Sequence, residues 1–434
     1  MTTSIAAAPA RKGFSARLTQ FILAALVLGL IVGYAMNQGI SDPAKLKSAA
    51  DSFTIVTDIF LRLIRMIIAP LVFATLVVGI AHMGDTAALG RIGARTLSWF
   101  IGASFLSLTL GLVLVNLLHP GKGLDLPLPP ASESAGLNTT AFNLHDLLTH
   151  IFPTSIIDAM ARNEILQIVV FSVFVGVALT AVGERGKPIV AVVEALASVM
   201  LKVTDYVMRF APLAVFAAVA HAIAVNGIGI IVTYAKFVGS FYFGLILLWL
   251  LLFGLCSMVI GGQARRLFGT LREPVLLAFS TASSEAAYPR TLEALDAFGV
   301  PRRIASFVLP LGYSFNLDGS MLYMTFATLF IAQAYGIDIP AGQQILMVLT
   351  LMITSKGIAG VPRASLVVIA AVMGQFGIPE GGLLLILAVD HFLDMGRSAT
   401  NVVGNAVATT VIARWEGQLD PPQAIETVAT TTET

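Results

Sequence analysis

The sequence predicts an all-α protein that crosses a membrane several times. Hydrophobic residues account for 57% of the 434 residues and charged residues for only 12%, which is half of the roughly 25% that is usual in soluble domains. The mean hydropathy is correspondingly high, at +0.87. Because a soluble fold of this length has too little interior to bury so much apolar surface, we expect a polytopic membrane protein.

Net charge and cysteine content exclude several functions. The 26 basic and 25 acidic residues leave a formal net charge of +1, whereas a nucleic-acid partner requires a basic surface. The single cysteine, Cys256, lies in an apolar run, which excludes a disulfide framework and a paired-cysteine metal site. We expect Cys256 to be a buried structural thiol.

Six spanning helices are predicted before residue 265. Residues 1–14 form a basic leader, and the apolar run 21–36 follows it. This run lacks a small-residue cleavage site, and further hydrophobic segments come after it, so we interpret it as a first spanning helix rather than a signal peptide. Five more spans are predicted near 52–82, 93–118, 151–183, 190–224 and 228–262.

Basic residues predict the orientation of these helices. They collect after the second, fourth and sixth spans, at Arg91, Arg95, Arg185, Lys187, Arg265, Arg266 and Arg272. Since cytoplasmic loops carry the excess of lysine and arginine, we expect a cytoplasmic N-terminus. The polar tail, 416–434, is expected to be cytoplasmic and disordered.

The pattern changes beyond residue 265. Two interrupted apolar segments, 274–296 and 343–376, alternate with two spans that contain polar residues, 302–335 and 380–413. If each interrupted segment is a hairpin that enters and leaves by one membrane face, the two halves form an inverted repeat, which indicates a transporter binding site. The predicted fold therefore has eight transmembrane helices and two re-entrant helical hairpins.

One helical face of the last span is strongly polar. Its members are three or four residues apart: Asp390, Asp394, Arg397, Asn401 and Asn405. Arg and Asp each cost about 2.5–3.5 kcal/mol at a bilayer centre. Internal pairing of Asp394 with Arg397 as structural glue is one interpretation. The favoured interpretation is a zwitterion site, in which Arg397 binds a carboxylate and Asp394 an ammonium group.

Two further polar segments are candidates for the same site. Ser283 and Ser284 can donate hydrogen bonds to a second carboxylate, although small hydroxyl residues also mediate helix packing in membranes. Asn316 and Asp318 supply oxygens suited to a hard cation, and we expect Gly319 to permit an unwound backbone. The alternative for this segment is a kink that serves helix packing.

Four segments of the chain resemble signature segments of the dicarboxylate/amino acid:cation symporter family. They are Ser283-Ser284, Asn316-Leu-Asp-Gly-Ser320, Gly357-Ile-Ala-Gly-Val-Pro362 and Asp394-Met-Gly-Arg-Ser-Ala-Thr-Asn401. They occur in the family's order, and the similarity extends from about residue 15 to residue 416. The family includes excitatory amino acid transporters and bacterial carriers of glutamate, aspartate and C4-dicarboxylates; this chain looks like the bacterial proton/glutamate-aspartate symporter type.

The resemblance implies a homotrimer in the cytoplasmic membrane that works by an elevator mechanism. Residues 15–265 would supply the scaffold and parts of the transport domain, and residues 266–415 the transport-domain core. The hairpin tips would lie near Ser283 and Gly360, with the second hairpin as the gate.

The resemblance also implies roles for individual residues. Arg397 and Ser320 would bind the substrate's side-chain carboxylate, and Asp394 its amino group. The substrate's main-chain carboxylate would be bound by Ser284, Ser398 and Asn401. The substrate would also contact the two hairpin tips, at Ser283, Gly360 and Val361. C4-dicarboxylate carriers of the family tend to lack a carboxylate at the position of Asp394, so its presence favours aspartate or glutamate. A C4-dicarboxylate:proton symporter is the alternative.

The coupling ion is predicted from departures from the family pattern. Sodium-coupled members have an acidic residue at the position of Asn405, Tyr and Thr at Phe100 and Ala103, and Met at Leu317. Losing oxygens from a hard-cation site is expensive, so we expect proton coupling, with Na⁺ as the alternative. Met324 occupies the position of a titratable glutamate in animal members. The candidates for the cation or proton site are Asn316, Asp318, Asp390, Asn405, Ser104, Ser355 and Glu285, with His391 as a further proton carrier.

Two other functional classes fit the sequence less well. A channel would favour symmetric rings of polar residues around one pore rather than a dense site in one chain. A membrane enzyme would require a catalytic motif, and the six histidines show no metal-binding spacing. We therefore expect a carrier without a cofactor, whose partners are an acidic solute and the lipid bilayer.

Overall fold

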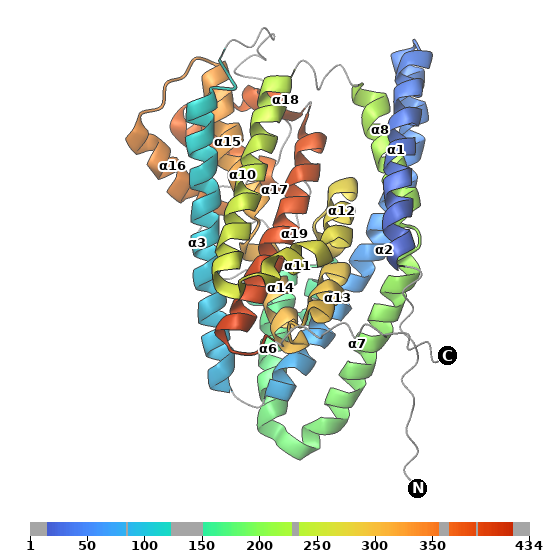
Figure 1. Cartoon of the computed structure of the whole chain (residues 1–434), viewed down its shortest axis with the longest axis vertical. Helices are drawn as coiled ribbons and strands as arrows, with labels where there is room; N and C mark the ends of the chain where they lie inside the picture. Colours follow the sequence, from blue (N-terminus) through green and yellow to red (C-terminus); the bar gives the residue numbers. More distant parts are fainter. Residues whose placement is uncertain are drawn as a thin grey trace, which may run out of the picture.

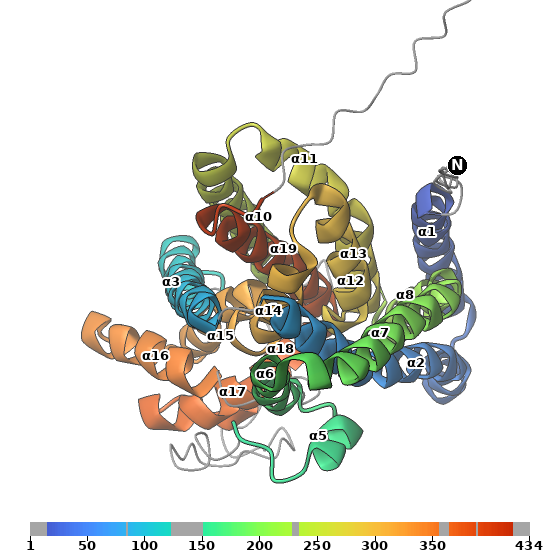
Figure 2. The same ribbon diagram turned by 90° about the horizontal axis from the view of Figure 1, so that it is seen from below.

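The computed structural model describes residues 15–83, 86–122, 151–227, 234–355, 364–387 and 389–419. Every regular element in these ranges is a helix (Figures 1 and 2), which confirms the all-α prediction. The buried side chain of Cys256 is also as predicted.

The first half of the chain forms long helices. They are α1 (Ser15–Gly39), α2 (Pro43–Met83), α3 (Thr86–Leu118), α5 (Ile156–Arg162), α6 (Ile165–Val182), the 3₁₀ turn η1 (Gly183–Gly186), α7 (Lys187–Met208), α8 (Ala211–Asn226) and α10 (Ala235–Ile260). Among the described residues, five helical stretches are long and apolar enough to cross a membrane. They are Gln20–Gly39, Pro43–Ala81, Leu89–Leu118, Ile165–Met208 and Ala235–Ile260. The total of eight spans stays a prediction.

The predicted span 190–224 is interrupted, because α7 ends at Met208 and α8 begins at Ala211. Pro212 lies in the first turn of α8. In a continuous helix Pro212 would have no N–H to donate to the Met208 carbonyl oxygen, and its ring would clash with that carbonyl group. The chain therefore restarts a helix at the proline.

The second half contains shorter helices. They are α11 (Gln263–Thr270), α12 (Arg272–Thr281), η2 (Glu285–Ala287), α13 (Tyr288–Phe298), α14 (Arg302–Phe315), α15 (Asp318–Ala334), α16 (Ala341–Thr354), α17 (Ala364–Met373), η4 (Gly374–Phe376), η5 (Glu380–Gly382), α18 (Leu383–Leu387) and α19 (Asp390–Trp415). The interrupted segment 274–296 forms the contacting pair α12 and α13, which we name hairpin 1. Ala282, between them, has left-handed backbone angles (φ 49°).

The segment 343–376 forms α16 and α17, which also contact each other. Its interruption, including Gly357, Gly360, Val361, Pro362 and Arg363, lies outside the described residues, as do the leader 1–14 and the tail beyond residue 419.

Both polar spans, predicted at 302–335 and 380–413, are split in the structure. The first breaks at Asn316 and Leu317, whose backbone angles are not helical, and the second between Leu387 and Asp390. The unwound backbone expected in segment 316–320 is present at Asn316 and Leu317, whereas Gly319 itself lies inside the first turn of α15. A Cβ atom there would lie 2.5 Å from the Arg397 carbonyl oxygen. Glycine is needed for the close approach of α15 and α19.

The helices pack in two groups. In the first group, α1 packs on α8, and α2 on α6, α7 and α8. A Cβ at Gly29 or Gly33 would approach the α8 carbonyl oxygens to 2.8 and 2.6 Å, so these glycines permit the tight α1–α8 contact. In the second group, α19 is surrounded by α10, α12, α14 and α15, with α3 against α15 (Figure 2). The groups meet where α14 contacts α2 and where α12 contacts α8.

Candidate substrate and cation site

The centre of the candidate site is Arg397 on α19, which is 1% exposed. Its Nη2 lies 2.8 Å from Oδ1 of Asp394 and 3.2 Å from Oδ1 of Asp390. Asp394 and Arg397, one turn apart, are therefore paired, as the alternative interpretation of this polar face expected. Asp390 is almost fully buried, whereas the side chain of Asp394 is 34% exposed.

Two of the three guanidinium nitrogens of Arg397, Nε and Nη1, are buried and make no hydrogen bond within the described part of the chain. A buried donor that is left unsatisfied costs about 1–3 kcal/mol. An oxygen-rich anion that reached Arg397 would satisfy these N–H groups. The arrangement can therefore bind a carboxylate, with the partly exposed Asp394 beside it.

Tyr323 on α15 packs its ring against the guanidinium group of Arg397. The guanidinium carbon lies 4.0 Å from the centre of the Tyr323 ring, within the range of a cation–π interaction. The Tyr323 hydroxyl donates a hydrogen bond of 3.0 Å to Asp390, which also accepts from Arg397. Sequence reasoning missed Tyr323, although its position three residues after Ser320 places it on the same helical face.

Asn401 connects α19 to the start of α15. Its Oδ1 accepts hydrogen bonds from the backbone N–H groups of Gly319 (2.9 Å) and Ser320 (3.3 Å), and its Nδ2 donates to the Ser320 hydroxyl (3.2 Å). Asn401 and Ser320 are therefore in contact, and Asn401 satisfies N–H groups at the first turn of α15. Ser398 is buried on α19, next to Arg397 in the chain.

A second polar cluster lies where α14, α15, α19 and α3 meet. Asn316 Nδ2 donates to Asp318 Oδ2 (3.0 Å) and to Asn405 Oδ1 (3.2 Å), and the Ser107 hydroxyl donates to Asp318 Oδ1 (3.2 Å). All four residues are buried. We name Asn316, Asp318, Asn405 and Ser107 the Asp318 cluster.

Two features complete the Asp318 cluster. A Cβ at Gly404 would collide with Oδ2 of Asp318, so glycine is required for the carboxylate to lie against α19. The Asn316 Oδ1 and Asn405 Nδ2 atoms are buried and make no hydrogen bond in the described structure. Ser107, which sequence reasoning missed, lies one turn beyond Ser104 on α3; the Ser104 hydroxyl donates to the Phe315 carbonyl oxygen (3.3 Å) at the end of α14.

The other predicted site residues lie outside these contacts. Ser283 accepts a hydrogen bond from the Ala286 N–H (3.2 Å), and Ser284 begins η2 beside the half-buried Glu285. No hydrogen bond among the described residues joins either serine to Arg397. The Ser355 hydroxyl donates to the Met352 carbonyl oxygen within the last turn of α16 (3.0 Å).

A buried arginine between carboxylates, inside a bundle of helices long enough to span a membrane, is typical of a multi-pass carrier of charged solutes. The family model described as the sodium:dicarboxylate symporter family matches residues 18–415. The chain belongs to this family, so it is a membrane transporter and not an enzyme.

Curated relatives cover nearly the whole chain. The proton/glutamate-aspartate symporter of Escherichia coli K12 is 41% identical over 93% of this chain and 94% of its own length. The proton/sodium-glutamate symport protein of Bacillus subtilis 168 is 37% identical over 95% of this chain and 96% of its own length. The C4-dicarboxylate transport protein 2 of Mesorhizobium japonicum is 38% identical over 98% of this chain and 95% of its own length.

Proposed function

We propose that the protein is a secondary active symporter that imports aspartate or glutamate across the cytoplasmic membrane together with a proton. The observation that carries the proposal is the buried Arg397, with two nitrogens that make no hydrogen bond in the described structure and with Asp394 beside it. Arg397 with Ser320 would bind the substrate's side-chain carboxylate, and Asp394 would bind the ammonium group. Ser283, Ser284, Ser398 and Asn401 would serve the main-chain carboxylate.

The partial exposure of Asp394 supports an amino acid as substrate. An aspartate or glutamate amine would give this carboxylate a charge-assisted hydrogen bond in addition to its contact with Arg397. A C4-dicarboxylate would instead bring a second negative charge close to Asp394. C4-dicarboxylates are the second candidate, because relatives named for their transport are 37–39% identical to this chain.

The composition of the Asp318 cluster supports the proton as coupling ion. Asn405 contributes an amide where sodium-coupled members have a carboxylate. Ala103 has no hydroxyl group where those members have a threonine, and the hydroxyl that reaches Asp318 here belongs to Ser107. A proton requires a single carboxylate, and both Asp318 and Asp390 are buried. Protonation would also remove the cost of carrying a bare carboxylate through a low-dielectric region. Sodium is the second candidate, since three of the similar proteins are named proton/sodium-glutamate symport proteins.

The mode of transport follows from the family resemblance. We propose a homotrimer in the inner membrane, with both termini in the cytoplasm, in which the transport domain moves as an elevator past the scaffold. The packing in two groups is compatible with such a movement, and α16 and α17 would carry the gate at the tip of the second hairpin.

Uptake into proteoliposomes tests the proposed function. Labelled aspartate, glutamate and succinate are offered separately, with an inward proton gradient or an inward sodium gradient imposed one at a time. We expect saturable accumulation of aspartate and glutamate, driven by the proton gradient in sodium-free buffer. Accumulation of succinate alone would identify a dicarboxylate carrier, and an absence of accumulation with every gradient would refute symport.

A further inference from the structure

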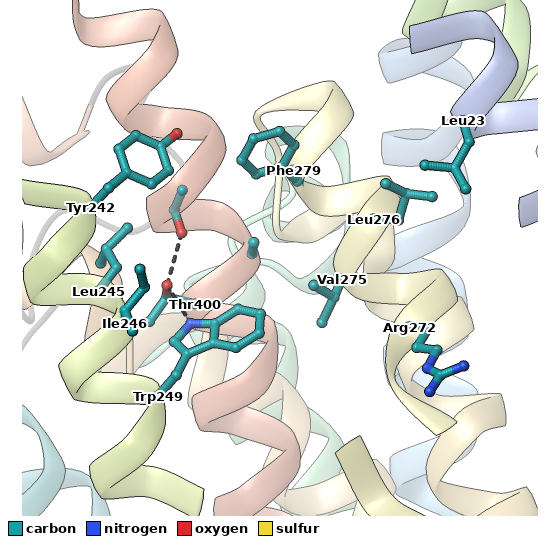
Figure 3. A pocket seen from close by; sticks show the side chains of 12 residues that line it. Leu23, Tyr242, Leu245, Ile246, Trp249, Arg272, Val275, Leu276, Phe279 and Thr400 are labelled. Atoms are coloured by element: carbon teal, nitrogen blue, oxygen red, sulfur yellow. Dashed lines mark hydrogen bonds between the residues drawn. The ribbon is translucent and has the colours of Figure 1, made fainter. Parts of the chain in front are cut away.

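A groove of about 500 Å³ lies between α1, α10, α12 and α19 (Figure 3). Trp249 on α10 and Leu276 and Phe279 on α12 form its walls, Leu23 on α1 closes one side, and Ala399 on α19 lies at its floor. Its volume is in the range of small-molecule sites, about 300–1,000 Å³. On a helical wheel, Ala399 points away from Asp394 and Asn401, so this part of the groove faces away from the substrate site, whereas Gly396, which also lines it, is next to Arg397 in the chain.

The polar atoms in the wall of the groove are already hydrogen-bonded within the protein. The Trp249 indole N–H donates to the Thr400 hydroxyl (2.9 Å), which itself donates to the Gly396 carbonyl oxygen (2.8 Å). The Tyr242 hydroxyl donates to the Phe392 carbonyl oxygen (2.6 Å). The remaining lining side chains are apolar, with one exception. The groove therefore fits a hydrocarbon chain rather than a polar solute.

The exception is Arg272, at the end of the groove where α12 begins (Figure 3). Its side chain is exposed, and no ion pair joins it to another residue in the described ranges. An apolar groove that ends at an arginine is complementary to an amphiphile with a hydrocarbon tail and an anionic head. Arginine binds a phosphate group with charge-assisted hydrogen bonds.

The surroundings of the groove identify the source of such a molecule. Leu23 and Ile246 line it and are 48% and 58% exposed, and Leu250, one residue beyond Trp249, is 61% exposed. In a membrane-spanning protein, exposed apolar side chains of this kind contact lipid. The groove is therefore continuous with the bilayer, and phospholipids reach it by lateral diffusion.

We propose that this groove binds one acyl chain of an anionic phospholipid, whose phosphate is held by Arg272. The lipid would lie between α1 of the first group and α10, α12 and α19 of the second group. The proposal does not depend on the transported substrate or on the coupling ion.

Trp249 provides a reporter inside the groove. The other two tryptophans, Trp99 and Trp415, lie outside the groove lining and contact each other edge to face, with ring centres 5.7 Å apart. Both are replaced by phenylalanine. The full chain is reconstituted in phosphatidylcholine vesicles that contain rising fractions of phosphatidylglycerol or phosphatidylcholine with brominated acyl chains, which quench indole fluorescence on contact. We expect half-maximal quenching at an about fivefold lower fraction of the brominated phosphatidylglycerol, the preference expected of one arginine at an anionic lipid surface.

Matched variants separate the groove from the bulk bilayer. Arg272→Gln should abolish the preference for phosphatidylglycerol, whereas Arg265→Gln, on the neighbouring helix but outside the groove, should keep it. Ala399→Phe should fill the floor and reduce quenching by both lipids, whereas Leu250→Phe should not. Equal quenching by the two brominated lipids in the protein with native Arg272 would overturn the proposal without any groove variant. A preference that persists in Arg272→Gln, or quenching that Ala399→Phe leaves unchanged, would overturn it as well.

Discussion

Asp205 on α7 and Arg290 on hairpin 1 form an ion pair between the two groups of helices, with Oδ1 and Nη2 3.2 Å apart. Arg290 is 11% exposed and also pairs with Glu273 and Glu293, which belong to hairpin 1 itself. Movement of the second group past the first would have to break the contact with Asp205. The contacts of Arg290 with Glu273 and Glu293 would stay intact, because all three residues would move together with hairpin 1.

This relationship predicts different effects for its two members. Arg290→Ala leaves two carboxylates of hairpin 1 and Asp205 without their shared cation, so we expect a clear drop in the melting temperature of the purified protein. Asp205→Asn removes the half-exposed contact between the groups and a longer ion pair with Lys202 within α7, each worth about 0.2–1 kcal/mol. We expect it to leave the melting temperature nearly unchanged and to alter the maximal uptake rate. Equal melting temperatures of Arg290→Ala and Asp205→Asn would contradict the central role of Arg290.

Removal of the central arginine should nearly abolish uptake of acidic amino acids. A buried arginine–carboxylate contact that is broken from one side costs about 3–5 kcal/mol, or roughly two to four decades in affinity. Binding of labelled aspartate to purified Arg397→Ala measures this loss. Arg302→Ala, on the exposed start of α14, serves as the control and should bind normally. Native aspartate affinity in folded Arg397→Ala would refute the assignment of the carboxylate site.

The role of Asp394 predicts a switch in substrate. A succinate would bring its second carboxylate close to the negatively charged Asp394 with no ammonium group between them, so the native protein should reject succinate. Asp394→Ser should lose aspartate binding while sparing or improving succinate binding. Competition against labelled aspartate and labelled succinate checks both statements. Succinate and aspartate competing equally well in the native protein would show that Asp394 does not bind an amine.

Tyr323 is predicted to position Arg397 through two separable contacts. Tyr323→Phe keeps the ring beneath the guanidinium and removes the hydrogen bond to Asp390, which is worth about 1.5–3 kcal/mol for a charged acceptor. Tyr323→Leu removes both contacts. We therefore expect aspartate affinity to fall about tenfold in Tyr323→Phe and further in Tyr323→Leu. If the two variants bind aspartate equally well, the cation–π contact contributes nothing to the site.

The proposed coupling ion predicts a gain of function at Asn405. Asn405→Asp would place a second carboxylate beside Asp318, and a hard cation prefers such an oxygen-rich site. We expect uptake by this variant to become dependent on Na⁺, while the native protein accumulates aspartate with a proton gradient alone. Asn37→Asp, the same change on α1 outside the Asp318 cluster, should not acquire a sodium requirement. Strict sodium dependence of the native protein, with no response to an imposed pH step, would overturn proton coupling and leave the substrate assignment untouched.

Several features were predictable because they depend on composition or on residues close together in the chain. The apolar content indicates a membrane protein, and the three-residue spacing of Asp394 and Arg397 places both on one helical face, where the structure shows them 2.8 Å apart. The interrupted segment around Ser283 predicts a helix pair, which is present as α12 and α13. Local patterns of this kind do not require knowledge of what packs against the helix.

Only the tertiary structure decided how these pieces combine. Ser107 reaches Asp318 across 211 residues of sequence, and Tyr323 supports Arg397 from another helix. Gly319 is glycine because of the Arg397 carbonyl oxygen from α19, not because of its own backbone angles. The polar segment 316–320 indicates a break in the helix, but only the structure shows that the break falls at Asn316 and Leu317 rather than at Gly319. Each of these features depends on the distance of approach between helices that are far apart in the sequence, and that distance is set by packing, which no periodicity within one segment encodes.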